Sequence, residues 1–280
     1  MKHEAPEAGG TPVALSIAGS DSGGGAGIQA DLRAFAFFKT FGTTAITAIT
    51  AQNPRAVTDV HPVPPASVTN QIQAVFAAFS VGAVKTGMLF NAGIIEAVAA
   101  ALAARPSVPV VVDPVMVATS GARLLREDAT KCLNERLLPL ATVITPNIPE
   151  AEILAGRPLD SDRAVLTAAH ELAQRFACTV MIKGGHHAAE PGTDLVSDGV
   201  SAWRLTAASV VAPSTHGTGC ALSAGIAAGL AQGNEVLEAI VRAKAFVHGS
   251  LQNCVNVGPE LWAMASPEKL SLDLVRYSQV

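Results

Sequence analysis

Charged residues are scarce in this sequence, and positive charge is not in excess. Only 15% of the 280 residues are Asp, Glu, Lys or Arg, and the formal net charge is -4. A protein that neutralises nucleic-acid phosphates needs a basic surface, which this composition does not supply. Uninterrupted apolar runs are short as well, and none approaches the 18 residues that a membrane-spanning helix needs. We therefore expect neither a nucleic-acid partner nor a membrane partner.

Cysteine is also rare, and its spacing argues against two common uses of this residue. The four cysteines are Cys132, Cys178, Cys220 and Cys254, and no two of them form a C-x-x-C pair. A disulfide framework and a structural zinc site are both unexpected with this spacing. The first dozen residues contain no apolar segment of the kind found in secretion signals. These features predict a cytoplasmic protein.

Short β-branched runs alternate with longer Ala- and Leu-rich amphipathic stretches along most of the chain. This alternation is typical of an α/β fold, here a doubly wound, mostly parallel sheet flanked by helices. A chain of this length with 49% hydrophobic residues can bury one large core. We expect a single domain over residues 13–280, preceded by a disordered tail at residues 1–12.

The pattern predicts six strands, several of them apolar on both faces as in a buried parallel sheet, and seven helices. The predicted strands span residues 13–19, 43–50, 81–87, 108–114, 141–146 and 179–185. The predicted helices span residues 28–38, 67–79, 92–104, 128–138, 160–176, 218–231 and 235–252. The segments TDLVSDG and VSAWRLTA predict an antiparallel pair that turns at Asp198 and Gly199, which gives the sheet a mixed edge.

A glycine-rich segment follows the first predicted strand. In a doubly wound sheet, ligands bind at the carboxyl ends of the strands, so the loops at these ends are the places to look for a site. Residues 19–27 read GSDSGGGAG, and such glycines allow backbone N–H groups to approach a ligand closely. A flexible turn explains a lone glycine run equally well. Asp31 follows near the start of the next helix, where its carboxylate either caps the helix or reaches a substrate.

A second glycine-rich segment, THGTGCALSAG at residues 215–225, directly precedes a long helix. Glycines at a helix start leave N–H donors free and place the positive end of the helix dipole there, which predicts an anion hole suited to phosphoryl transfer. No G-x-x-x-x-G-K-[ST] segment exists, so a P-loop is excluded. The position of Cys220 predicts a lowered thiol pKa and a role as a base. A small buried core cysteine is an equal alternative.

Polar residues end three further predicted strands: Asp113 in VVVDPVM, Asn147 and Glu150 in TPNIPE, and Lys183 in MIKGGH. Two carboxylates and a lysine beside an anion hole would suit Mg²⁺ and nucleotide phosphates. Each residue alone could instead be a cap or half of an ion pair. We assign no metal to the adjacent histidines, His186 and His187.

The combined segments resemble a known family. In order, they are IAGSDSGGGAGIQADL, TAITAQN, VKTGML, VVVDPVM, ITPNIPEAEIL, IKGGH and STHGTGCALSAGIAAGLAQG, and together they cover most of the chain. The set resembles the ribokinase superfamily and, within it, the hydroxymethylpyrimidine/phosphomethylpyrimidine kinases of thiamine biosynthesis. Members use ATP and Mg²⁺ to phosphorylate 4-amino-5-hydroxymethyl-2-methylpyrimidine and then its monophosphate, and they are commonly homodimers.

The resemblance also implies roles for individual residues. Cys220 takes the place of the aspartate base of the superfamily's sugar kinases, and the backbone of Gly217, Thr218, Gly219 and Cys220 forms the anion hole. The residues implied around the pyrimidine are Ala26, Asp31, Gln52, Met88 and Val115. Those implied for the nucleotide are Asn147, Lys183 and Thr215, and those implied for magnesium are Asp113 and Glu150.

Two other functions fit parts of the pattern. A pyridoxal kinase phosphorylates a similar methyl-bearing ring with a hydroxymethyl group, so dual activity remains open. The Gln52 amide favours the aminopyrimidine because it offers both a donor and an acceptor. A non-catalytic pyrimidine sensor is less consistent with the complete phosphoryl-transfer set of Asp113, Glu150 and Lys183.

Overall fold

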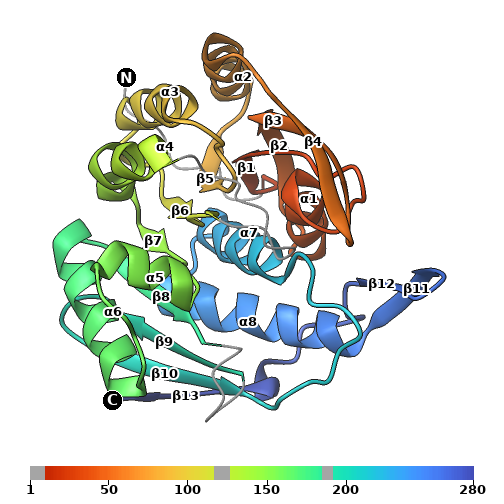
Figure 1. Ribbon diagram of the computed structural model, residues 1–280, viewed down its shortest axis with the longest axis vertical. Coiled ribbons are helices and arrows are strands. Elements are labelled where there is room, and N and C mark those ends of the chain that lie inside the picture. The colour runs from red at the N-terminus through yellow and green to blue at the C-terminus, as the bar shows by residue number, and fades with distance from the viewer. Residues whose placement is uncertain (1–9, 117–126, 185–191) are drawn as a thin grey trace.

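The computed structural model describes residues 10–116, 127–184 and 192–280. Most of the predicted tail, residues 1–9, therefore lies outside the described residues, as do His186 and His187. The described chain forms a nine-stranded sheet with helices on both faces (Figure 1). This is the predicted architecture.

The sheet contains a parallel part and an antiparallel edge. Its order is β13-β10-β9-β8-β7-β6-β5-β1-β2, and the six strands from β8 to β2 in that order run parallel. β9 pairs antiparallel with β8, β10 with β9, and β13 with β10. The strands of this sheet are β1 (Val13–Ala18), β2 (Phe41–Ile46), β5 (Val81–Thr86), β6 (Val110–Val112), β7 (Val143–Ile144), β8 (Thr179–Lys183), β9 (Thr193–Ser197), β10 (Ala202–Ala207) and β13 (Val275–Gln279).

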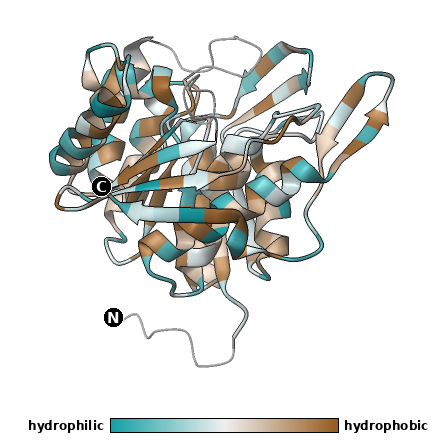
Figure 2. Ribbon diagram, turned by 90° about the horizontal axis from the view of Figure 1, so that it is seen from below, coloured by the Kyte–Doolittle hydropathy of each residue, from teal (hydrophilic) through white to brown (hydrophobic). Residues whose placement is uncertain are grey.

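Two hydrophobic cores hold the helices against the two faces. One face carries α1 (Gly27–Phe37), α7 (Thr218–Ala231) and α8 (Val236–Gln252). The other face carries α2 (Pro65–Ala78), α3 (Ala92–Ala103), α4 (Glu127–Cys132), α5 (Ile148–Ala155) and α6 (Asp162–Phe176). Figure 2 shows hydrophobic residues along the central strands and mixed colours along the outer helices, as expected for helices with one face against the sheet.

Small residues let α7 and α8 pack closely. A Cβ added to Gly225 would lie 3.0 Å from the Cβ of Ala243, and one added to Gly229 would lie 2.9 Å from the Cβ of Ala239. Larger side chains at these two positions would push α7 away from α8 and shift the start of α7, where the second glycine-rich segment lies.

Several predicted boundaries were wrong. The predicted strand at residues 43–50 is two strands, because the chain leaves the large sheet after β2 and forms β3 (Ala48–Asn53), which pairs with β4 (Ala56–Pro62) in a separate sheet. The predicted helix at 128–138 changes after α4 into a π-helical turn, Leu133–Leu137. The prediction missed β4, α5, β13 and a small hairpin of β11 (Cys254–Gly258) and β12 (Leu261–Met264).

The strand order reverses between β1 and β5. The chain adds β2 on one side of β1 and then returns to the other side to build β5, β6, β7 and β8 in succession. A crevice forms at such a switch point, outside the carboxyl ends of the strands. None of the described helices combines the length and apolar character needed to cross a bilayer.

Candidate active site

A cavity of about 860 Å³ opens at the carboxyl ends of the parallel strands. Its lining includes thirteen of the fourteen residues that the sequence and the resemblance single out: Ala26, Gln52, Met88, Asp113, Val115, Asn147, Glu150, Lys183, Thr215, Gly217, Thr218, Gly219 and Cys220. The fourteenth, Asp31, is fully buried and is absent from the lining. A cavity of this size is within the range of small-ligand sites.

The glycine loop, residues 19–27, connects β1 to α1 and folds around the carboxylate of Asp21. One oxygen of Asp21 accepts the N–H of Gly23 at 2.8 Å, and the other accepts the N–H of Ala26 at 2.7 Å. Gly27 has a φ of +56°, and a Cβ there would lie 2.5 Å from the carbonyl oxygen of Gly19. Only glycine fits this position, which brings the loop backbone into the cavity.

The second glycine-rich segment forms the N-terminus of α7. Gly217 has a φ of +86°, and α7 begins at Thr218 with no side-chain cap. The Thr218 N–H already donates a hydrogen bond to the Thr215 carbonyl at 3.3 Å. Three residues further along, the Ala221 N–H donates to the Gly217 carbonyl. Among the described residues, the N–H groups of Gly219 and Cys220 therefore remain free to face the cavity. The resemblance implies four backbone N–H groups for an anion hole, and two of these, those of Gly219 and Cys220, are free among the described residues.

The Cys220 thiol lies on the first turn of α7. Burial raises its pKa to about 11, and the positive charge of Lys85 and an N–H from Gly27 offset only part of this increase. The expected lowering by the helix terminus was wrong, because the loss of hydration outweighs the helix dipole here. The thiol is protonated at neutral pH in the unliganded protein.

Lys85 was not predicted, although it lines the cavity. It lies on β5, and its ammonium contacts both carboxylate oxygens of Asp31 at 2.9 and 2.8 Å, with no exposed surface on either side chain. Ser16 donates a further hydrogen bond to Asp31 at 2.6 Å. Asp31 therefore holds the Lys85 ammonium in a buried ion pair and does not itself line the cavity. Burial favours a lower pKa for Lys85, but the charges of Asp31, Cys220 and Asp113 outweigh it, so its pKa lies above the usual value.

On the opposite side of the cavity, Lys183 lies between two carboxylates. Its ammonium is 2.9 Å from one oxygen of Asp113. Glu150 caps α5 together with Asn147: it accepts the Asn147 N–H at 2.9 Å while its own N–H bonds the Asn147 side chain. Burial raises the pKa of Glu150, and the nearby Lys183 opposes that increase. Asn147 and Glu150 thus form a helix cap, and Lys183 and Asp113 form an ion pair, as the alternative interpretations allowed. All four residues also line the cavity.

Gln52 and Met88 lie at the β1 and β3 side of the cavity. The Ser22 hydroxyl bonds the backbone N–H and carbonyl of Gln52 at 2.8 and 2.7 Å. Within the described residues the side-chain amide of Gln52 has no hydrogen-bond partner, so it is available to a ligand. Met88 is held by its carbonyl, which accepts the Thr47 hydroxyl at 2.6 Å.

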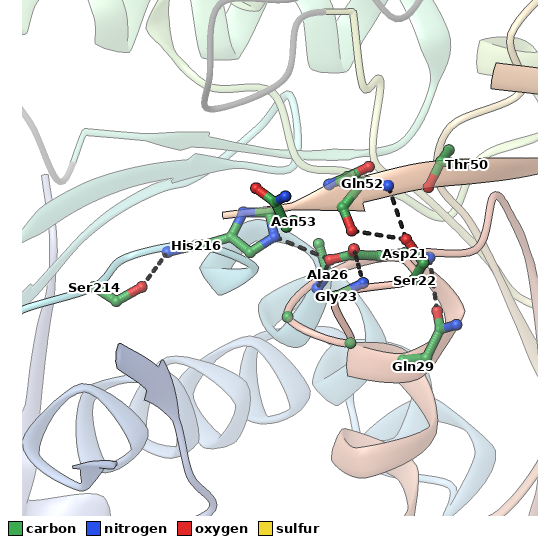
Figure 3. A network of polar contacts seen from close by, with 12 residues as sticks. Asp21, Ser22, Gly23, Ala26, Gln29, Thr50, Gln52, Asn53, Ser214 and His216 are labelled. Carbon is green, nitrogen blue, oxygen red and sulfur yellow. Dashed lines mark hydrogen bonds and ion pairs between the residues drawn. The ribbon is translucent and has the colours of Figure 1, made fainter. Parts of the chain in front are cut away.

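The sequence reasoning missed Asp21, Lys85 and His216, all of which line the cavity. Asp21 and His216 are 195 residues apart, yet the His216 Nε2 atom lies 3.0 Å from an Asp21 oxygen (Figure 3). Asp21 and His216 both lie inside the glycine motifs quoted above, and this position could have marked them as candidates. Lys85 could have been found because it is a charged residue within a predicted strand. Their partners could be found only from the tertiary structure.

Comparison with known proteins gives consistent relatives. A family model described as Phosphomethylpyrimidine kinase matches residues 21–264. The hydroxymethylpyrimidine/phosphomethylpyrimidine kinase of Rhizobium meliloti is 50% identical over 242 residues, which cover 86% of this chain and 91% of that protein. The thiamine biosynthesis bifunctional protein ThiED of Geobacter sulfurreducens is 47% identical over 238 residues, covering 85% of this chain. The match spans 49% of ThiED, about half its length.

A solved structure extends the similarity to the whole fold. The pyridoxal kinase from Staphylococcus aureus in complex with AMP-PCP matches with a TM-score of 0.87 at 33% identity. The match covers 97% of this chain and 100% of that chain. A nucleotide analogue is therefore bound by a protein of the same architecture.

Proposed function

The chain belongs to the phosphomethylpyrimidine kinase family and is a ribokinase-like hydroxymethylpyrimidine/phosphomethylpyrimidine kinase of thiamine biosynthesis, and from this premise we propose how its residues divide the work. The pyrimidine ring lies against Gln52, Met88, Val115 and Ala26, with the Gln52 amide pairing with the polar edge of the ring. The triphosphate of ATP extends from the Asn147, Lys183 and Thr215 side toward the N-terminus of α7.

One observation carries this assignment. The free N–H groups of Gly219 and Cys220 and the Cys220 thiol occupy the first turn of α7, inside a cavity that holds Gln52 and Met88 as well as Lys183 and Asp113. Phosphoryl transfer needs donors where charge develops on the transferred group, and a group at the acceptor oxygen. Both are present at one point between the two proposed ligands.

Magnesium fits the cavity as a partner of the phosphates. The described residues contain no group of three or more His, Cys, Asp or Glu that could hold a metal ion by themselves. Asp113 and Glu150 supply two carboxylates, and magnesium commonly uses one or two together with phosphate oxygens and water. When bound, the ion would neutralise charge on the phosphates. Asp113 and Glu150 would hold it, and Lys183 would contact the phosphates directly.

The two phosphorylations place different demands on Cys220. In the first, an O–P bond forms at the hydroxymethyl oxygen, its proton must leave, and ADP departs. In the second, the acceptor is a phosphate oxygen whose last proton has a pKa of about 6, as for phosphorylated side chains, and which is mostly ionised at neutral pH. A base is needed for the first step and is dispensable for the second.

Pyridoxal is a second candidate substrate. The observation that favours it is the fold similarity to pyridoxal kinases, including one in complex with pyridoxal at a TM-score of 0.85 and 32% identity. The hydroxymethylpyrimidine/phosphomethylpyrimidine kinases of Rhizobium meliloti and Bacillus subtilis are more similar in sequence, at 50% and 44% identity. Activity on the pyrimidine therefore stands first, and activity on pyridoxal is a secondary proposal.

We also propose a cytoplasmic homodimer. Support for self-association comes from the open edge of the sheet, where Phe41 of β2 is 51% exposed and stacks on Phe79 at a centroid distance of 5.7 Å. Exposed aromatic pairs of this kind favour an interface. Light scattering on the purified protein tests this, and a mass of one chain would contradict it.

The test of function is a substrate panel. Purified protein is incubated with ATP and Mg²⁺ plus hydroxymethylpyrimidine, its monophosphate, pyridoxal or pyridoxine at equal concentration, and ADP release and products are measured. We expect turnover of both pyrimidines to exceed that of pyridoxal. Turnover of pyridoxal alone would reverse the order of the two candidates, and ATP consumption with no substrate preference would contradict both.

A further inference from the structure

Two loops from opposite ends of the chain meet at the reaction centre. The glycine loop, residues 19–27, touches the proposed pyrimidine site, and the entry loop to α7, residues 214–217, leads to the anion hole. Between them, the His216 Nε2 atom lies 3.0 Å from the carboxylate of Asp21. Figure 3 shows the imidazole of His216 directed at Asp21, with the N–H groups of Gly23 and Ala26 bonded to the same carboxylate.

The contact is partly buried and includes one buried carboxylate. The side chain of Asp21 is 2% exposed and that of His216 is 16% exposed. Burial favours a higher pKa for Asp21, but the hydrogen bonds from His216, Ala26 and Gly23 outweigh it and hold the pKa below the ordinary value. Asp21 is therefore an ionised acceptor with three donors, and two of them come from its own loop while the third comes from the other loop.

The backbones of the two loops are in contact as well. A Cβ on Gly217 would lie 2.0 Å from the carbonyl oxygen of Gly25, and one on Gly25 would lie 2.4 Å from the His216 ring. The Gly27 N–H also lies close enough to the Cys220 thiol to favour a lower pKa for it. Displacement of either loop would therefore move Ala26 and Gly27 relative to the N–H groups at the start of α7.

We propose that Asp21 and His216 are positioning residues that hold the pyrimidine side and the phosphate side of the active site in register. Phosphoryl transfer requires the acceptor oxygen to lie in line with the γ-phosphorus at near-contact distance, and a misplacement of about 1 Å can lower the rate about 10²-fold. The Asp21–His216 contact sets that distance from outside the reacting atoms. Neither residue takes up the acceptor proton. This inference rests on the proposed function and adds the residues that align its two substrates.

The contact also predicts which step is affected. Because both phosphorylations use the same two loops, loss of the contact slows both. Loss of the base at Cys220 affects mainly the first. The two kinds of defect are therefore distinguishable in one set of assays.

The test compares Asp21→Asn, His216→Ala, His216→Gln and the double variant Asp21→Asn/His216→Ala. We expect Asp21→Asn and His216→Ala to lower kcat by about 10-fold to 100-fold on both pyrimidines while KM for ATP changes less than about twofold. His216→Gln keeps an N–H donor and should recover most of the activity. The double variant should be no slower than the slower single variant, because both remove one contact.

Asp198→Asn is the matched control. Asp198 also accepts two backbone N–H groups, those of Val200 and Ser201 at 2.8 and 2.6 Å, but it lies in an exposed turn away from the cavity. It should leave kcat unchanged. Thermal unfolding of every variant, with and without hydroxymethylpyrimidine, separates misfolding from misalignment.

Three outcomes overturn the proposal: wild-type kcat in both single variants, losses that multiply in the double variant, or a His216→Gln variant as slow as His216→Ala. A wild-type protein that turns over no pyrimidine would instead contradict the proposed function. If the wild type used only pyridoxal, the same variants assayed on pyridoxal would still test the Asp21–His216 contact.

Discussion

At the scale of single residues, the proposed chemistry depends on when the Cys220 thiol loses its proton. Burial holds its pKa at about 11, so the thiol is a weak acid beside Lys85, and it is not a resting thiolate. Only the thiolate form of Cys220 can accept the acceptor proton, so the thiol must lose its own proton before it acts as a base. The loose transition state of phosphoryl transfer makes little demand on a base before bond formation, which is compatible with a protonated resting state.

Replacement of Cys220 by serine should separate the two phosphorylations. Serine keeps the backbone N–H of the anion hole and removes the thiol. We expect kcat on hydroxymethylpyrimidine to fall about 10²-fold, within the range for general-base catalysis, and kcat on its monophosphate to fall less than about threefold. Single-turnover rates with each pyrimidine measure this. Equal losses on both would remove the base assignment and leave Cys220 as a donor of its N–H alone.

The same thiol predicts a pH dependence. Below a pKa of about 11 the thiolate fraction rises about tenfold per pH unit, so kcat/KM for hydroxymethylpyrimidine should increase between about pH 7 and about pH 9.5. The monophosphate has lost its last proton by neutral pH, so its kcat/KM should be level over that interval. The Cys220→Ser variant should lose the alkaline rise with the first substrate. A rise of the same slope with both substrates would assign the titration to another group.

At the scale of elements, a buried ion pair joins α1 to β5 next to the reaction centre. Asp31 of α1 and Lys85 of β5 have no exposed side-chain surface, and the Lys85 ammonium offsets part of the effect of burial on Cys220. Removing one partner of a buried pair leaves an uncompensated charge in a medium that solvates it poorly.

Lys85→Met should therefore destabilise the protein by about 3 to 5 kcal/mol, and Lys85→Met/Asp31→Asn should recover part of that loss. Urea unfolding measures both. Arg136→Met is the control, since the Arg136–Glu96 pair is 2.9 Å long but about half exposed and should cost less than about 1 kcal/mol. A Lys85→Met variant as stable as the control would show that Asp31 is neutralised or solvated in some other way.

The elements also show how far the sequence predicts the fold. The strands β1, β5 and β8 are short runs of mainly apolar residues, and their predicted positions agree with the structure to within two residues at either end. The run at residues 43–50 has the same local composition throughout, so nothing local marks the point at Thr47 where the chain leaves the sheet. The small strands near the C-terminus, β11 to β13, exist through pairing with distant or flanking strands, which a local pattern does not record.

For the site, the motifs predicted which loops meet but not which side chains bond across them. Glycine positions are readable because backbone geometry demands them, as at Gly27 and Gly217. The Lys85–Asp31 and Asp21–His216 contacts link segments separated by 54 and 195 residues. Such contacts depend on the tertiary fold, so Asp31 was assigned to the substrate and Lys85 was overlooked.

At the scale of the whole molecule, the cavity lies between two halves of the sheet. β1 and β5 of the large sheet, together with β3 of the small sheet, supply the proposed pyrimidine side. β7, β8 and α5 supply the proposed nucleotide side, and the start of α7 lies between them. In the proposed arrangement each ligand contacts one side of the cavity, and both ligands share the N–H groups at the start of α7. When one ligand orders that shared segment, the other ligand binds with a smaller loss of conformational entropy.

Binding of the two ligands should therefore be cooperative in stability. We expect the rise in Tm with hydroxymethylpyrimidine, AMP-PCP and Mg²⁺ together to exceed the sum of two separate rises, each measured at a fixed ligand concentration well above its Kd. The two separate rises are the one with hydroxymethylpyrimidine alone and the one with AMP-PCP and Mg²⁺ alone.

Omitting Mg²⁺ should reduce the nucleotide contribution, because Asp113 and Glu150 then face phosphate oxygens without a cation between them. In Asp113→Asn, which removes one of these carboxylate charges, the difference between the Mg²⁺-containing and Mg²⁺-free samples should shrink. Differential scanning calorimetry measures all of these shifts. Strictly additive shifts would show that the two halves of the cavity bind their ligands independently, and an unchanged magnesium effect in Asp113→Asn would move the cation away from that carboxylate.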